Sequence, residues 1–410
     1  MRKFILGSLA ALALVVPQTV FAADTPVLVS TAVLPDVALK VASNSAIADS
    51  VANDQGVLLG GLGSDLYHIP GDAADIFYAI TDRGPNNDTV QPDKSAGTGF
   101  VVPTFSPLIM KVQLSGSTVK ILETHAIKTK AGASATGLPN IKGYDAVPTD
   151  VKGITADTLY NLAGLDAEGI VKAANGDFWI VDEYAPSLAQ LSSTGAIKAR
   201  YVPTGWKGNP TSFKAVKSIP ALYLTRKANR GFEALALSPD GKTLFIGLQS
   251  PLLNPTKAIG DASLATRILR FDIGSKRFTG EFAFGFEKVS LVDAKATKNS
   301  DLKLSAMVAL DSNTLLVQER TDNSFLLSTI TIDDSANILG SKWDLAATSP
   351  SLETYTGVGT NAEVEKLLAA NNKKVIFNST SIATMPGKIE GVAVIAVSYT
   401  HLTLPTKRIV

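Results

Sequence analysis

Three glutamates occupy the same position in three similar segments, each just ahead of an apolar run. They are Glu168 in Leu165–Val171, Glu233 in Gly231–Ala236 and Glu390 in Lys388–Ala393. Because an isolated carboxylate is costly to bury, packing alone does not explain a charge that recurs at one point of a repeat. Carboxylates bind hard cations such as Ca²⁺ and also act as general bases. We therefore predict that Glu168, Glu233 and Glu390 are catalytic residues.

Other polar residues stand close to these glutamates or end the strands beside them. The predicted substrate-binding residues are Arg83, Arg230, Arg320, Lys388 and Gln249, and the predicted metal ligands are Asp82, Asp182, Glu183 and Glu319. Arginine carries forked donors that match phosphate. A metal ion on the carboxylates would polarise a phosphoryl oxygen and supply hydroxide. The set predicts a calcium-assisted site that hydrolyses an anionic ester. The alternative is that these charges form structural salt bridges between neighbouring repeats.

Several other chemistries are disfavoured. The chain contains no Gly-x-Ser-x-Gly motif, and its histidines before the last residues, His68 and His125, fit structural roles. Gly241-Lys242-Thr243 belongs to a hairpin turn rather than a phosphate loop. The chain has no cysteine, which makes zinc improbable. We expect no nucleotide, flavin, haem or zinc cofactor.

Hairpins position the glutamates. Glu168 precedes a strand, the turn Asn175-Gly176-Asp177 and a second strand, and Glu233 precedes the same pattern around Pro239-Asp240-Gly241. Similar units start near Gly56 and Met307. Repeated units of this kind are typical of β-propellers. We predict an all-β fold, a β-propeller of five to seven four-stranded blades, in which the first strand of each blade brings the three glutamates into one funnel.

Insertions interrupt this repeat. Residues 85–104 and 131–160 are rich in turns and weakly patterned, and such loops on a rigid scaffold often carry function. One or two short helices are expected. The clearest is predicted at Ala362–Ala370, with Asn361 as its N-cap and glutamates in its first turns.

The chain ends differ from the repeat. Residues 1–22 combine a basic start, an apolar core and a small-residue cleavage pattern, which predicts a signal peptide. Residues 23–395 form the predicted propeller domain. Residues 396–410 contain neither the expected turn nor an acid, and resemble a translated cloning adaptor on a truncated chain. We predict a monomer in a bacterial periplasm or medium, without a membrane anchor.

The hairpin motifs together resemble one known family. The segments are Ile80–Gly84, Leu165–Gly169, Val181–Glu183, Arg230–Leu235, Val317–Arg320 and Lys388–Gly391. In order and spacing they resemble the phytase-like family described as having esterase-like activity. The resemblance implies a secreted or periplasmic β-propeller that hydrolyses phosphoric or carboxylic esters.

Three functions follow from these observations. The first is a metal-assisted phosphoesterase, the second a lactonase or carboxylesterase on the same propeller, and the third a non-catalytic propeller that binds an anionic ligand. The expected partner is a small-molecule anionic ester. Nucleic acid is not expected, because the net charge is only +1.

Overall fold

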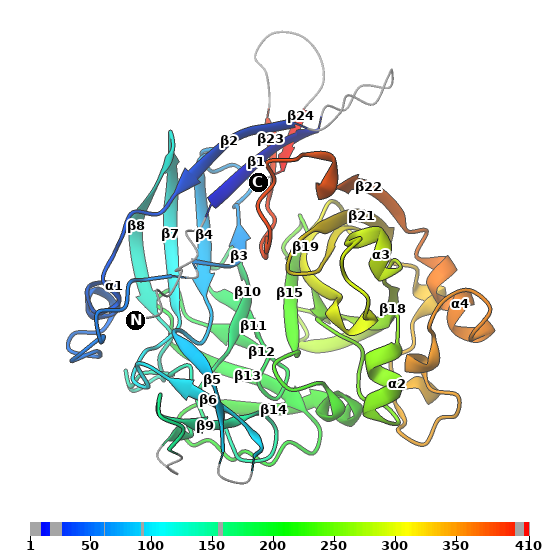
Figure 1. Cartoon of the computed structure of the whole chain (residues 1–410), viewed down its shortest axis with the longest axis horizontal. Helices are drawn as coiled ribbons and strands as arrows, with labels where there is room; N and C mark the ends of the chain where they lie inside the picture. Colours follow the sequence, from blue (N-terminus) through cyan, green and yellow to red (C-terminus); the bar gives the residue numbers. More distant parts are fainter. Residues whose placement is uncertain are drawn as a thin grey trace.

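The computed structural model describes residues 10–16, 27–60, 62–91, 94–154, 159–397 and 406–409. Strands dominate it, and Figure 1 shows their sheets arranged around a common centre. The described helices are few and short: α1 (Leu39–Ala46), α2 (Lys257–Ala262), α3 (Val289–Val292) and α4 (Ala362–Ala370). The predicted β-propeller is therefore confirmed.

Four blades are formed by consecutive stretches of chain. The first contains β3 (Leu62–Tyr67), β4 (Ile76–Thr81), β7 (Leu108–Ser115) and β8 (Thr118–Ala126). The second contains β10 (Ala167–Lys172), β11 (Phe178–Asp182), β12 (Ser187–Leu191), β13 (Ile197–Pro203) and the added parallel strand β14 (Lys214–Ile219). The third contains β15 (Phe232–Leu237), β16 (Thr243–Leu248), β17 (Ala265–Asp272) and β18 (Arg277–Gly285). The fourth contains β19 (Lys303–Ala309), β20 (Thr314–Arg320), β21 (Phe325–Thr331) and β22 (Lys374–Asn378).

A fifth unit closes the ring from the two ends of the chain. It joins β23 (Val394–Val397), β24 (Thr406–Ile409), β1 (Ala10–Val16) and β2 (Val27–Val33), and β2 connects it to β8. The segment before β23 passes close to β3, since a Cβ on Gly391 would lie 2.7 Å from the backbone nitrogen of Leu66. The four strands of this unit belong to one eight-stranded sheet with the first blade, and β1 and β24 lie outside the predicted domain of residues 23–395, so the number of blades stays a prediction.

The predicted leader and tail lie only partly within this unit. β1 belongs to the predicted signal peptide and β24 to the predicted adaptor tail. The rest of both segments, with a few neighbouring positions, lies outside the described residues. These positions are 1–9, 17–26, 398–405 and 410. Both assignments stay predictions.

The core lies mainly between neighbouring blades, as expected when each blade buries one face against the next. Ile80, Ile170 and Phe178 pack between the first two blades, and Phe282 and Leu304 between the third and fourth. Helix α4 has its predicted cap, because the side chain of Asn361 accepts a hydrogen bond from the backbone nitrogen of Val364. Among the described residues, none of the helices has both the length and the apolar character needed to span a membrane.

The insertions are more ordered than the sequence predicts. They contain a separate three-stranded sheet of β5 (Asn86–Val90), β6 (Ala96–Phe100) and β9 (Val147–Thr149). This sheet belongs to the connections β4–β7 and β8–β10, which meet the blades where the inner strands begin. The long connections β16–β17 and β18–β19 meet the same face, so the insertions are concentrated at one end of the channel.

Candidate functional site

The inner strands share a bulge at the end where the long connections meet. Their pairing shifts between Leu62 and Asp65 in β3, Ala167 and Ile170 in β10, Phe232 and Ala234 in β15, and Leu304 and Ala306 in β19. An extra residue in a bulge changes the direction of the side chain at that point. Glu168, Glu233 and Ser305 stand inside three of these shifts. Two of the three recurring glutamates, Glu168 and Glu233, are therefore bulge residues of inner strands, whereas Glu390 lies before β23.

Close packing explains the glycine that follows two of the glutamates. A Cβ on Gly169 would lie 2.7 Å from the Cβ of Leu235 and 2.9 Å from the carbonyl oxygen of Glu233. A Cβ on Gly391 would meet the backbone of β3 in the same way. Only glycine permits such close approach of neighbouring inner strands. The Glu-Gly pairs thus combine a charge aimed by the bulge with tight contact between blades.

Glu233 and Glu390 meet at one arginine. Nη2 of Arg320 donates to Oε1 of Glu233 at 3.0 Å and to Oε1 of Glu390 at 2.7 Å. Nε of Arg320 donates to Oγ of Ser305 at 2.6 Å, and Ser305 donates to Glu233. Arg320 is only 2% exposed. The donors of Arg320 already have partners. Arg320 therefore fits the role of a structural salt bridge between blades better than that of a substrate-binding residue.

Arg83 forms a second bridge between blades. Its Nη1 donates to Oδ2 of Asp166 at 2.9 Å, and its backbone nitrogen donates to Oδ1 at 3.2 Å. Nη1 also donates to Asn229, and Nη2 reaches Asn86 in β5 at 3.4 Å. Arg83 thus ties the first blade and its insertion to the acidic end of the second blade.

Three carboxylates form the tightest acidic group among the described residues. One oxygen from each of Asp166, Glu168 and Glu183 lies within 4.8 Å of the others. Burial, together with the charges of Asp166 and Glu183, raises the pKa of Glu168 well above its usual range. Burial and the charges of Asp166 and Glu233 do the same for Glu183. These acids therefore hold protons strongly unless a cation replaces them.

Glu183 has an unused acceptor. Glu183 is 2% exposed, and among the described residues nothing forms a hydrogen bond with its Oε1. Buried polar atoms are nearly always satisfied, so such an atom calls for an explanation. Asp166 and Glu183 fit a hard cation as oxygen ligands, with Glu168 as the third.

The remaining predicted ligands are placed differently. Asp182 accepts from Arg200 at 2.7 Å and Ser187 at 2.8 Å, inside its own blade. Glu319 accepts from Lys373 at 2.6 Å and from the backbone nitrogen of Glu287 at 2.7 Å. Neither belongs to the acidic group.

Asp82 accepts from the backbone nitrogen of Gly84 at 2.8 Å, where Gly84 has a φ of 90°. Burial and the charge of Asp166 raise the pKa of Asp82 to about 6. Asp82 therefore shapes the turn beside Arg83 while contributing to the negative potential of the site.

The other predicted substrate-binding residues differ in availability. Arg230 donates to Oγ of Ser250 at 3.2 Å and, within the described part of the chain, forms no ion pair. Lys388 is exposed, with Nζ 3.7 Å from Oε1 of Glu390. Gln249 is buried and its Oε1 has no partner, while its backbone bonds to Gly231 and Leu304. Arg230 is thus the arginine best placed to bind an added anion.

Sequence reasoning missed three residues of this region. Asp166 lies two positions before Glu168 and could have been found from the same motif. Ser305 replaces the glutamate in Leu304-Ser305-Ala306, which aligns with Phe232-Glu233-Ala234 only once the bulge is known. Asp65 accepts from the backbone nitrogen of Ile170 at 3.0 Å and clamps β3 to β10, without a sequence signal that we can name.

One curated relative is a protein from Arthroderma benhamiae named "Uncharacterized secreted protein", 28% identical over 287 residues. The match covers 58% of this chain and 54% of the relative, so the chain spans about half the relative's length.

Similar solved structures include a protein from Lactobacillus plantarum, with 13% identity, 80% of each chain covered and a TM-score of 0.30. Another is the Dos1 propeller, with 11% identity, 67% of this chain and 56% of that chain covered, and a TM-score of 0.28. TM-scores of 0.30 and 0.28 are too low to support a conclusion about this protein.

The model of one protein family, described as "Phytase-like: Esterase-like activity of phytase", matches residues 57–404. Because this match spans most of the sequence, the chain belongs to the phytase-like family.

Proposed function

We propose that this protein is an exported hydrolase that cleaves a small anionic ester at the acidic end of the propeller channel, with calcium as its cofactor. The observation that carries the proposal is the buried, unpartnered oxygen of Glu183 beside Asp166 and Glu168. Family membership supports ester hydrolysis as the reaction class.

The donor set fits a calcium ion. Calcium takes carboxylate oxygens and tolerates irregular geometry. Six carboxylates influence one another here: Asp82, Asp166, Glu168, Glu183, Glu233 and Glu390. The basic groups that act on them are Arg83, Arg230, Arg320, Lys303 and Lys388. A divalent cation would offset this excess of negative charge. When bound, it would polarise the ester oxygen and stabilise the charge that develops there.

Glu390 is the best candidate for the general base. Its side chain is 25% exposed, and the hydrogen bond from Arg320 and the contact with Lys388 both involve Oε1. The other oxygen is left to accept a proton from the attacking water. Arg320, held by Glu233 and Ser305, fixes the orientation of this carboxylate. In this proposal Glu233 and Arg320 are positioning residues.

Arg230 would bind the negative group of the substrate. It lies close enough to Glu183 for its charge to oppose the rise in the pKa of that acid. Within the described part of the chain, its side chain forms one hydrogen bond, to Ser250. A guanidinium with free donors matches a phosphate or carboxylate. The substrate would then lie between Arg230 and the cation.

Export is part of the same proposal. The predicted leader and the name of the Arthroderma benhamiae relative both support a secreted or periplasmic protein. We further propose that the protein acts as a monomer on a small molecule, rather than on nucleic acid or a membrane.

Calcium binding and ester hydrolysis test the proposal separately. Titration calorimetry with Ca²⁺ should show one site in the purified protein. Glu183→Gln should weaken that site at least about tenfold, because a charged ligand is lost. Glu363→Gln is the matched control, since Glu363 is exposed on α4 and should not affect the site.

Hydrolysis of p-nitrophenyl phosphate and p-nitrophenyl butyrate should then be measured with Ca²⁺ and with EDTA. We expect turnover of at least one ester, lost with EDTA. Glu390→Gln should lower kcat about a hundredfold while Ca²⁺ still binds. Turnover of the butyrate alone would favour the carboxylesterase alternative. Calcium binding without turnover of either ester would show a binding propeller, and absence of calcium binding would refute the metal assignment.

A further inference from the structure

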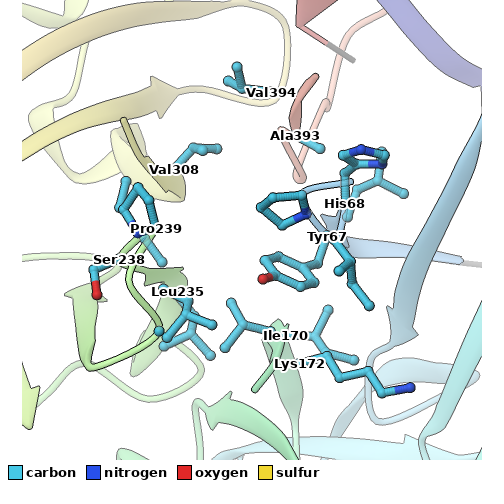
Figure 2. A pocket seen from close by; sticks show the side chains of 18 of the residues that line it. Tyr67, His68, Ile170, Lys172, Leu235, Ser238, Pro239, Val308, Ala393 and Val394 are labelled. Atoms are coloured by element: carbon cyan, nitrogen blue, oxygen red, sulfur yellow. The ribbon is translucent and has the colours of Figure 1, made fainter. Parts of the chain in front are cut away.

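A large cavity lies at the opposite end of the channel from the acidic group. Its volume is about 630 Å³, within the range of small-molecule sites. Each of the five inner segments contributes to its wall, through Tyr67, Ile170, Leu235, Val308 and Ala393. Figure 2 shows these side chains around one open space. The inner strands run from the acidic end to this cavity, so the channel has two chemically different mouths.

The wall of this cavity is mainly apolar. Of the acids that line it, Asp72 and Asp240 are exposed, and both carboxylate oxygens of Asp65 accept backbone hydrogen bonds. Nζ of Lys172 donates to the hydroxyl of Tyr78 at 2.6 Å and lies 4.4 Å from the centre of that ring. Figure 2 shows the Lys172 side chain directed away from the open space. Nδ1 of His68 is 3.0 Å from the carbonyl oxygen of Ile76, and its ring packs on Phe77. A charged ligand would therefore find no compensating partner in the middle of the cavity.

Tyr67 supplies one polar atom. Its ring reaches into the cavity from the end of β3, and its hydroxyl points into the space between the inner strands (Figure 2). None of the hydrogen bonds described for the protein involves this hydroxyl. Burial, followed by the charge of Asp72, raises the pKa of Tyr67 to about 12. The phenol is therefore neutral at physiological pH and able to donate to an acceptor.

We propose that this cavity is a second binding site, for an uncharged and mainly apolar small molecule that carries one hydrogen-bond acceptor, such as a carbonyl or ether oxygen. The apolar walls bury the body of the ligand, and the Tyr67 hydroxyl donates to its acceptor. The site is separate from the proposed ester site, because it uses residues that follow the glutamates along the inner strands. Occupation of one mouth does not require occupation of the other.

Nile red is a suitable probe, since it is neutral and apolar and carries a carbonyl acceptor. Its fluorescence should rise saturably with one dye bound per protein. Val308→Arg places a charge in the wall and should weaken binding more than tenfold. Val41→Arg is the matched control, because Val41 is exposed on α1 and the same change there should leave binding unaltered.

Tyr67→Phe gives a second, milder test that preserves the ring. Loss of the Tyr67 hydroxyl as a donor should weaken binding about five- to tenfold. Calcium affinity should remain unchanged in both cavity variants, which separates this site from the acidic one. The proposal is overturned if Nile red does not saturate, or if Val308→Arg binds it as the unmodified protein does. Sedimentation that shows a dimer dissociated by Val308→Arg would also overturn it, in favour of a second copy covering this mouth.

Discussion

Replacement of Arg320 by methionine tests whether this arginine holds the blades together or grips substrate. Arg320 is 2% exposed and donates to Glu233, Glu390 and Ser305. Removing one partner of a buried ion pair typically costs about 3–5 kcal/mol, because the remaining charge is left unpaired. Glu390 is partly exposed and can be rehydrated, whereas Glu233 is 1% exposed and cannot. We expect Arg320→Met to lower the free energy of unfolding by about 3–5 kcal/mol.

Urea denaturation, followed by the fluorescence of the buried Trp179 and Trp206, measures this loss. Adding Glu233→Gln to Arg320→Met should recover about 1–3 kcal/mol, since the orphaned charge is removed. Arg270→Met is the control. Its partner Asp334 is largely exposed, and such pairs contribute at most about 1 kcal/mol.

A loss from Arg320→Met as small as that from Arg270→Met would refute this interpretation. If the same variant kept its stability and raised KM for an anionic ester, Arg320 would be a substrate-binding residue. The two roles thus give opposite patterns in stability and kinetics.

Calcium affinity should increase with pH, because the raised pKa of Glu183 means that calcium must displace a proton. Calorimetry in two buffers of different ionisation enthalpy should show this proton release. Binding without proton release would contradict the proposed calcium site. Gly169→Ala should destabilise the fold by about 1–3 kcal/mol, since the added Cβ would lie 2.7 Å from a side-chain carbon of β15. Gly274→Ala has room at 3.6 Å and should be nearly neutral in the same urea assay. The hydrogen bond from Asn323 lowers the pKa of Asp293, so its contribution to stability is present above about pH 4 and is lost as the pH falls through the folded-state pKa. Melting temperatures of Asp293→Asn and the unmodified protein should therefore differ at pH 7, and the difference should shrink as the pH falls through the lowered pKa of Asp293.

The fold was predictable because its signals are local. Alternation and turn residues mark each hairpin, and repetition of that pattern predicts the propeller. The N-cap at Asn361 was also local and is present. The sheet of β5, β6 and β9 was not predicted, since its strands come from two insertions about 50 residues apart and pair only in three dimensions.

The site was only partly predictable, because neighbours in sequence point in different directions. Glu319 and Arg320 are consecutive, yet Glu319 bonds Lys373 and Arg320 reaches the channel. Side chains alternate along a strand, so adjacent charges rarely share a site. Asp182 and Glu183 separate in the same way at the end of β11, where Asp182 pairs with Arg200. Proximity in sequence therefore grouped carboxylates that the structure places in different surroundings.

The repeated bulge explains why the closely spaced carboxylates lie on one side of the ring. In β15 and β19 the bulge positions hold Glu233 and Ser305, so one arginine, Arg320, satisfies that side through an acid and a hydroxyl. In β10 the bulge residue is Glu168, and Asp166 and Glu183 lie beside it. Among the residues that the structure describes, Arg83 alone forms an ion pair with this group. Had Ser305 been a glutamate like Glu168 and Glu233, the negative charge would be spread around the channel. Its replacement by serine leaves the uncompensated charge beside β10, which is where we expect the cation.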